Sequence, residues 1–154
     1  MAAMKTVFIT LGVIFLILIV LVAGFVGYAA YVGTKLDASS KAYVDASVPA
    51  IISTWSKDEL KKRASPQLLK SASDEQIDDL FTRLAAQLGS FQSYDGSKGD
   101  SNVSYTTQDG KVISASYTAN ATFQNGKIDI QVKLIQINSD WFLLGFHVEP
   151  HSAN

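Results

Sequence analysis

The strongest constraint on this chain is a run of 29 consecutive residues without a charge, from Thr6 to Thr34. A helix needs about 20 mostly apolar residues to cross the hydrocarbon core of a bilayer, so this run is long enough even when tilted. A helix is predicted despite the many β-branched residues of this run, because backbone groups in lipid must hydrogen-bond within their own segment. Residues 1–33 are therefore predicted to be a transmembrane signal anchor.

A cleaved signal peptide is the alternative for this segment. Signal peptides carry an apolar region of about 7–15 residues before a small-residue cleavage site. Ala23-Gly24 and Ala29-Ala30 offer small residues of that kind, but the apolar run is longer than the signal-peptide range. The length favours an uncleaved anchor.

The charges beside the span give little information on orientation. Lys5 precedes the span, whereas Lys35 and Lys41 follow it, so the positive charges are nearly balanced. A very short amino-terminal tail before a single span is typical of bacterial signal anchors. We expect a single-pass protein of the bacterial inner membrane, with a cytoplasmic N-terminus and a periplasmic C-terminal domain.

Small residues recur one helical turn apart inside the span. The pairs are Ala23 with Gly27 and Ala29 with Gly33. Such pairs let a second helix approach closely. They indicate helix–helix packing in the membrane, although small residues are also common in membrane helices for other reasons.

The rest of the chain has the composition of a water-exposed domain. The first 34 residues hold 26 apolar side chains and one charge, whereas the other 120 are about 39% apolar and carry 26 charges. The chain has no cysteine, which excludes disulfides, thiol nucleophiles and cysteine metal sites. Twelve basic and fourteen acidic residues in this part argue against a nucleic-acid-binding protein.

The segment that follows the span is predicted to be mainly helical. Residues 34–46 are predicted to continue it as a helical stalk, residues 47–150 to form the folded domain, and residues 151–154 to form a tail. Ser56 and Ser65-Pro66 are typical starts of two short helices, up to 64 and 71. The segment Asp74–Leu88 has a Ser73-x-x-Gln76 capping box and apolar residues at helical spacing, so it predicts an amphipathic helix.

Strand patterns follow from Phe91 onward. The apolar period changes from helical to two, which predicts strands at residues 91–95, 103–107, 112–123, 128–137 and 141–149, and residues 96–100 are expected to form a loop. Asp109-Gly110 and Asn125-Gly126 are hairpin-turn signals. A change of parity at Leu134-Ile135 predicts a β-bulge there. The chain therefore belongs to the α+β class, with two or three helices packed on a curved antiparallel meander of four or five strands.

The order of these segments resembles the nuclear transport factor two-like superfamily, also called the cystatin-like cone. The resemblance covers roughly residues 40–150 and lies in the segments 65–69, 73–81, 88–93 and 141–148. It implies a cone fold like that of the small bacterial domains of this group. The anchor followed by a cone is similar in layout to members with one span and an exported domain. Members of this superfamily include a type IV secretion core component, proteins that accompany lipid-import systems, and enzymes such as ketosteroid isomerase. The fold therefore implies no single function.

No residue is assigned a catalytic role. A catalytic group must sit in a desolvated pocket within reach of a substrate proton, and the strand parity of the candidate acids and histidines places most of them on the polar face. His147, Glu149 and His151 form a His-x-Glu-x-His pattern, but Pro150 interrupts the strand. We therefore predict no metal site and no cofactor.

A ligand pocket inside the cone is the first candidate site. Its predicted lining residues come from the amphipathic helix and from the inward faces of three strands: Leu80, Leu84, Tyr105, Tyr117, Phe123 and Phe146. The tyrosines are expected to point toward the core, and packed core residues are the alternative interpretation.

A partner-binding surface is the second candidate site. Lys57, Lys61, Lys62 and Arg63 concentrate positive charge on one short helix, where a solvated helix face is the simpler interpretation. On the last strand, Phe142, Leu144, Phe146 and Val148 are expected to face the core. Trp141 and Leu143 would then form an exposed apolar patch.

These observations favour a membrane-anchored interaction module without enzymatic activity, such as an accessory or assembly subunit of an inner-membrane complex. Its expected partners are the membrane and either a membrane protein or a second copy of the chain, with lipid as a further candidate and no nucleic acid. The alternative is a cone domain that binds lipid or a small ligand.

Overall fold

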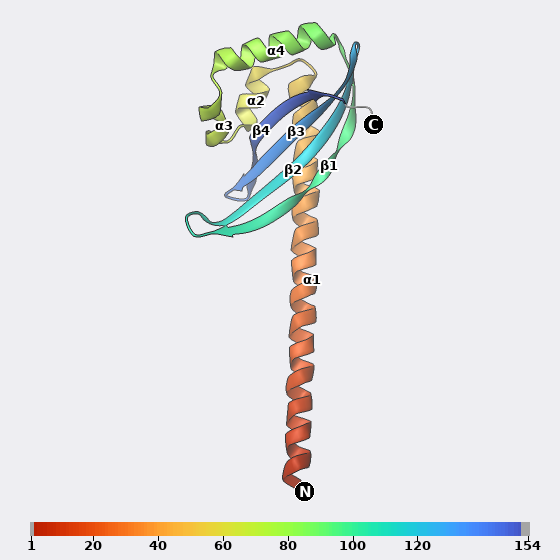
Figure 1. The fold of residues 1–154 in the computed structure, drawn as a ribbon, viewed down its shortest axis with the longest axis vertical. Helices are drawn as coiled ribbons and strands as arrows, with labels where there is room; N and C mark the ends of the chain where they lie inside the picture. The colour runs from red at the N-terminus through yellow and green to blue at the C-terminus, as the bar shows by residue number, and fades with distance from the viewer. Residues whose placement is uncertain (1, 152–154) are drawn as a thin grey trace. The chain divides into compact units, whose positions relative to one another are not determined.

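The computed structural model describes residues 2–151, in helices followed by strands (Figure 1). The helices are α1 (Ala2–Ile52), α2 (Lys57–Arg63), α3 (Pro66–Ser71) and α4 (Asp74–Leu88). The strands are β1 (Phe91–Thr106), β2 (Gly110–Phe123), β3 (Gly126–Ile137) and β4 (Asp140–Pro150). This order confirms the predicted α+β class. Of the predicted tail, residues 152–154 lie outside the described residues.

The chain divides into two compact units, residues 1–35 and residues 36–154. In the first unit, all side chains from Ile9 to Tyr31 are exposed. Among residues 2–151, α1 is the one helix long and apolar enough to cross a membrane. The long apolar helix is thus confirmed, whereas its orientation and the kind of membrane stay predictions.

The second unit begins earlier than the sequence predicted. Ser40 and Val44 are fully buried, as are Val48 and Ile51 one and two turns further on. Their spacing of three or four residues places them on one face of a helix, which packs on the sheet. Most of the predicted stalk, residues 34–46, therefore belongs to the folded domain.

Serine caps start the three short helices as predicted. The side chains of Ser56, Ser65 and Ser73 accept hydrogen bonds from backbone N–H groups of α2, α3 and α4 respectively. Ser73 and Gln76 form the complete capping box. These bonds satisfy N–H groups that have no partner within a helix.

The four strands form one antiparallel sheet in the order β1-β2-β3-β4. The first strand passes through residues 96–100, where the sequence predicted a loop. Gly99 explains the difference, because a Cβ atom there would lie 1.9 Å from the carbonyl oxygen of Ser116. Glycine thus allows two backbones to approach and the strand to continue. The cone assignment stays a prediction.

A bulge on β4 changes which side chains face the core. Lys133 pairs with Gly145 and Leu134 pairs with Leu143, so Leu144 is the extra residue. The sequence placed the bulge on β3, at Leu134-Ile135. The extra residue reverses the alternation along β4, so Trp141 and Leu143 lie on the core side together with Phe146 beyond the bulge.

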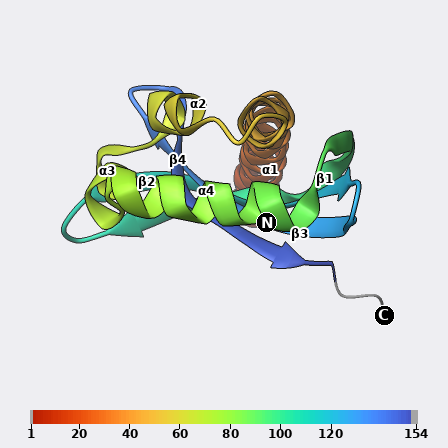
Figure 2. The same ribbon diagram turned by 90° about the horizontal axis from the view of Figure 1, so that it is seen from above.

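The core lies between one face of the sheet and the helices. Residues 36–52 of α1, together with α2 and α4, contribute buried side chains to it. Trp55 is partly buried and packs against this core, with its ring 5.6 Å from that of Phe123 and 5.3 Å from that of Phe81. Helix α2 contacts α4, and α3 contacts β4, so the short helices form one group (Figures 1 and 2). The opposite sheet face exposes polar residues such as Thr118 and Gln131.

Candidate functional site

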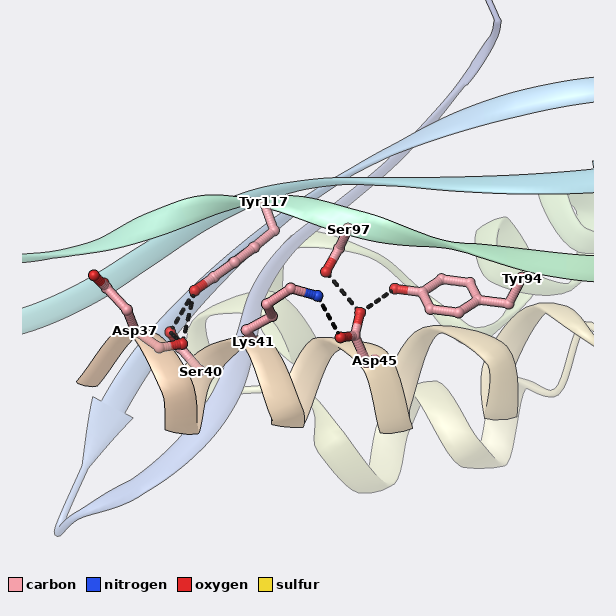
Figure 3. Close-up of polar contacts among 7 residues, drawn as sticks. All are labelled: Asp37, Ser40, Lys41, Asp45, Tyr94, Ser97 and Tyr117. Atoms are coloured by element: carbon pink, nitrogen blue, oxygen red, sulfur yellow. Dashed lines mark hydrogen bonds and ion pairs between the residues drawn. The ribbon is translucent and has the colours of Figure 1, made fainter. Parts of the chain in front are cut away.

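A row of polar contacts joins α1 to β1 and β2 (Figure 3). Asp45 Oδ1 accepts hydrogen bonds from Tyr94 Oη at 2.7 Å and from Ser97 Oγ at 2.6 Å, and Lys41 Nζ donates to Asp45 Oδ2 at 2.6 Å. Burial alone would raise the pKa of Asp45, but the three donors outweigh it and hold this pKa below its usual value. Burial and the contact with Asp45 raise the pKa of Tyr94.

The other end of the row is centred on Asp37. Ser40 Oγ and Tyr117 Oη lie 2.8 Å apart, and Tyr117 Oη donates to the backbone oxygen of Asp37 at 3.1 Å. The Asp37 carboxylate accepts the backbone N–H of Ser101 at 2.7 Å and also contacts the Ser101 hydroxyl. Since β1 is an edge strand, this contact occupies an N–H group that another chain could otherwise pair with.

This row holds the domain together and is poorly suited to acid–base catalysis. A general base works best with a pKa near the working pH, whereas the donors around Asp45 lower its pKa. Sequence reasoning missed the role of Asp37, Asp45 and Ser97. The contacts between α1 and β1 join residues 49 to 64 positions apart in the chain, so no local pattern reveals them.

The predicted ligand-pocket residues do not meet in one cavity. Tyr117 and Phe123 are packed core side chains, 3% and 2% exposed. Tyr105 is 77% exposed, near the turn between β1 and β2, so the expectation that it points to the core is wrong. Leu84 lines a separate recess of about 500 Å³ beside the end of β4. Leu80 and Phe146 do lie together.

An apolar hollow of about 90 Å³ lies between α2, α3, α4 and β4. Leu80 and Leu69 form its rim, and each keeps more than two fifths of its surface exposed. Its walls are almost entirely apolar, from Leu60, Ala64, Leu68, Ala72, Ile77, Phe81 and Phe146. We call this hollow and its two rim leucines the α2–α4 face.

The basic residues of α2 are mostly paired with acidic ones. Lys61 Nζ lies 2.9 Å from Asp74 and Lys57 Nζ lies 2.7 Å from Asp78, so two ion pairs tie α2 to α4. The hydrogen bond from Lys61 lowers the pKa of Asp74.

Two further cations complete this region. Arg63 pairs with Glu59 on the same helix. Lys62 is exposed and forms no ion pair with any residue of 2–151. The predicted basic surface is therefore largely neutralised.

The predicted exposed patch of Trp141 and Leu143 is wrong. Leu143 is fully buried and Trp141 is 8% exposed, because the bulge at Leu144 turns both toward the core. Trp141 Nε1 donates to Ser39 Oγ at 3.0 Å. Phe142 and Leu144, predicted to be core residues, are partly exposed instead.

The two histidines near the C-terminus contact different carboxylates. His151 Nδ1 lies 2.6 Å from Asp129 Oδ1, and His147 Nε2 lies 3.2 Å from Glu149 Oε1. Asn120 also donates to Asp129, at 2.6 Å. Among the described residues, no group of three or more acidic or histidine side chains is arranged to hold a metal ion.

The small residues of the span lie on an exposed helix. Ala23 and Ala29 are exposed, and a Cβ atom added at Gly27 or Gly33 would meet nothing within 4 Å in this chain. Packing of this helix against another therefore stays a prediction.

Comparisons with protein-family models, curated proteins and solved structures found no match for this chain. The resemblance to the nuclear transport factor two-like superfamily thus stays a prediction.

Proposed function

We propose that this chain is a single-span, membrane-tethered interaction module whose domain binds a protein partner through the α2–α4 face. In this proposal it has no enzymatic activity and serves as an accessory or assembly subunit of a bacterial inner-membrane complex. The N-terminus is cytoplasmic and the domain is periplasmic. The observation that carries the proposal is the apolar hollow with two exposed leucines at its rim.

The size of the hollow favours a protein partner. Pockets for small molecules are typically about 300–1,000 Å³. The hollow measures about 90 Å³, well below that range. That volume suits one branched apolar side chain, which is how an anchoring residue of a protein partner is bound.

The surroundings of the hollow also suit an interface. The ion pairs of Lys57 and Lys61 with α4 leave little net charge to desolvate when a partner covers the face. The exposed apolar helix of the first unit supplies the tether, because burying its side chains in lipid is strongly favourable.

The alternative is a domain that binds lipid or a small ligand. Ala115, Ala119 and Ala121, which would line a large cone cavity, are instead covered by the helices and at most 2% exposed. The rings of Phe81 and Phe123 both pack against the ring of Trp55 in the same core. This packing favours the interaction module.

Extraction of the chain from native membranes in a mild detergent tests the proposal, with mass spectrometry of co-purifying proteins and lipids. Wild type is compared with Leu80→Asp, and with Val103→Asp as a matched control because Val103 is also exposed, near the β1–β2 turn. We expect a protein to be retained by wild type and Val103→Asp but lost from Leu80→Asp. Wild type that purifies alone overturns the proposal, and loss of a lipid alone favours the alternative.

The orientation in the membrane is tested separately by labelling one introduced cysteine, since the chain has no cysteine of its own. Gln108→Cys places it at an exposed position in the turn between β1 and β2. A periplasmic domain predicts labelling by a membrane-impermeant maleimide in intact cells. Labelling only after lysis would contradict this orientation. Membrane insertion is tested by washing the membranes with alkaline carbonate, and release of the chain by this wash would contradict a transmembrane span.

A further inference from the structure

We propose that the tip of the β1–β2 hairpin, residues 103–112, rests on the membrane surface, where Val103 and Tyr105 contact the lipid headgroup layer. The inference rests on the membrane span of the proposed function and is independent of the α2–α4 face. It adds a second contact with the membrane to the span itself.

The contacts between α1 and β1 place the hairpin tip at the end of the domain where the chain enters. Asp45 accepts a hydrogen bond from Ser97 (Figure 3), and about two turns earlier in α1 Asp37 accepts one from Ser101. A step along β1 toward its C-terminal end is therefore a step back along α1 toward Leu36, the first residue of the domain. The hairpin tip continues β1 beyond Ser101, so it lies at this end.

The chain leaves little distance between this end of the domain and the membrane. The run without charge ends at Thr34, and Lys35 is the single residue between it and the domain. In a helix the rise from Thr34 to Asp37 is about 4.5 Å, whereas a strand extends about 13 Å from Ser101 to Tyr105. The headgroup layer adds about 5–7 Å on each side of the hydrocarbon core. The hairpin tip is therefore long enough to reach lipid headgroups.

The side chains of the hairpin tip suit this layer. Val103 and Tyr105 are 37% and 77% exposed, and alternation along the strand places them on the same face as Ser101, which contacts α1. They thus occupy core-side positions that the helices leave exposed. An aromatic ring with a hydroxyl group favours the headgroup region of a bilayer. Asp109 and Lys111 are the only charges of residues 103–112, so no net charge opposes the contact.

A lipid surface explains this exposure more simply than a protein partner does. Four large apolar side chains of the described part of the domain are strongly exposed: Leu69 and Leu80 at the α2–α4 face, and Val103 and Tyr105 on the hairpin tip. In every anchored molecule the bilayer lies beside the point where the chain enters the domain, so no further component is needed to cover the tip. A contact with lipid also brings no protein to this hairpin.

Quenching of a fluorophore by a spin-labelled lipid tests the inference. The full-length chain is placed in phosphatidylcholine vesicles without other proteins, and the nitroxide is carried on the lipid headgroup. The fluorophore is attached to Gln108→Cys at the tip or, as a control, to Gln92→Cys at the opposite end of β1. Both positions are exposed, and the chain has no cysteine of its own. We expect quenching at position 108 and none at position 92.

Two double variants connect the quenching to the named side chains. In the Gln108→Cys background, Val103→Ser/Tyr105→Ser should abolish the quenching, because it removes both apolar side chains from the tip. Leu69→Ser/Leu80→Ser is the matched control, since it removes two exposed apolar side chains from the α2–α4 face instead. It should leave the quenching unchanged.

Three results overturn the inference, each obtained while the chain floats with the vesicles: no quenching at position 108, equal quenching at positions 108 and 92, or quenching that persists in Val103→Ser/Tyr105→Ser. Each of them leaves the proposed function standing, because it concerns the hairpin alone. A chain that does not float with the vesicles contradicts the span instead, and both proposals are then wrong.

Discussion

Ser40 Oγ and Tyr117 Oη lie 2.8 Å apart in a fully buried contact that joins helix α1 to strand β2. It connects positions 77 residues apart and makes the helix after the span part of the domain. The Tyr117 hydroxyl also donates to the backbone oxygen of Asp37, so one hydroxyl contacts α1 at two positions about one turn apart.

Removing this hydroxyl should destabilise the domain. Tyr117→Phe leaves the buried Ser40 hydroxyl and the Asp37 carbonyl without this partner, at a cost of about 1–2 kcal/mol. Tyr105→Phe is the control, because Tyr105 is largely exposed, and its effect should stay within about 0.5 kcal/mol. Chemical unfolding of both variants in detergent measures the difference. Equal stabilities of Tyr117→Phe and Tyr105→Phe would contradict the buried contact of the Tyr117 hydroxyl.

The stability contributed by Asp45 should depend on pH. Its pKa is lowered in the folded state, so its contribution is present above the unfolded pKa of about 3.9 and is lost as pH falls through the folded pKa. Asp45→Asn should cost about 1–2 kcal/mol at pH 7. The gap to wild type should shrink as pH falls below about 4. Unfolding at a series of pH values measures it.

Asp100→Asn is the control for this substitution, because the Asp100 side chain is exposed on the same sheet and makes no hydrogen bond to any described residue. At pH 7 its stability should stay within about 0.5 kcal/mol of wild type. A gap between Asp45→Asn and wild type that stays constant down to pH 3 would rule out the charge of Asp45 as the cause.

Gly99 should tolerate no side chain. A Cβ atom there would lie 1.9 Å from the Ser116 oxygen, so Gly99→Ala must push β1 away from β2, at a cost of about 3 kcal/mol or more. Gly145→Ala is the matched control in β4, since its Cβ would lie 3.5 Å from the Lys133 side chain. Thermal unfolding compares them. A Gly99→Ala variant as stable as Gly145→Ala would show that β1 does not pass so close to β2.

The bulge at Leu144 predicts that Leu143 is a core residue. Leu143→Ala should cost about 2–5 kcal/mol, whereas an exposed leucine at this position would cost less than about 0.5 kcal/mol. The change is compared with Leu144→Ala, which should have the smaller effect because Leu144 is partly exposed. A larger loss of stability for Leu144→Ala than for Leu143→Ala would show that the bulge is not at Leu144.

Local patterns predicted most of the fold. The caps at Ser56, Ser65 and Ser73 depend on neighbouring backbone groups, and the two hairpin turns depend on Asp109-Gly110 and Asn125-Gly126. In β2 the alternation of small apolar and polar residues matches the buried and exposed faces. Such features are determined within a few residues, so they can be read from sequence.

The errors arose where the deciding contact is distant in the chain. Residues 141–144 are all apolar, so alternation there cannot tell which face is buried, and the register with β3 decides it. The continuity of β1 depends on the close approach of Gly99 to β2. The end of α1 looked like a stalk because its polar residues, including Asp37 and Ser40, bond to the sheet.

The candidate site was predicted only in part. Leu80 and Phe146 were expected in a pocket and do line the hollow. The neutralisation of Lys57 and Lys61 was not expected, because their partners lie 21 and 13 residues away on another helix. Amphipathic patterns show that a helix has an apolar face, but not where packing leaves part of it uncovered.

Site-specific photo-crosslinking in native membranes tests the central claim, that the α2–α4 face is the binding surface. A photoreactive phenylalanine analogue replaces Leu80 in one variant and Tyr105 in another, since both side chains are exposed. The account predicts a heavier adduct from position 80, containing a partner protein or a second copy, and none from position 105. No adduct from position 80, or one from position 105 alone, would contradict it.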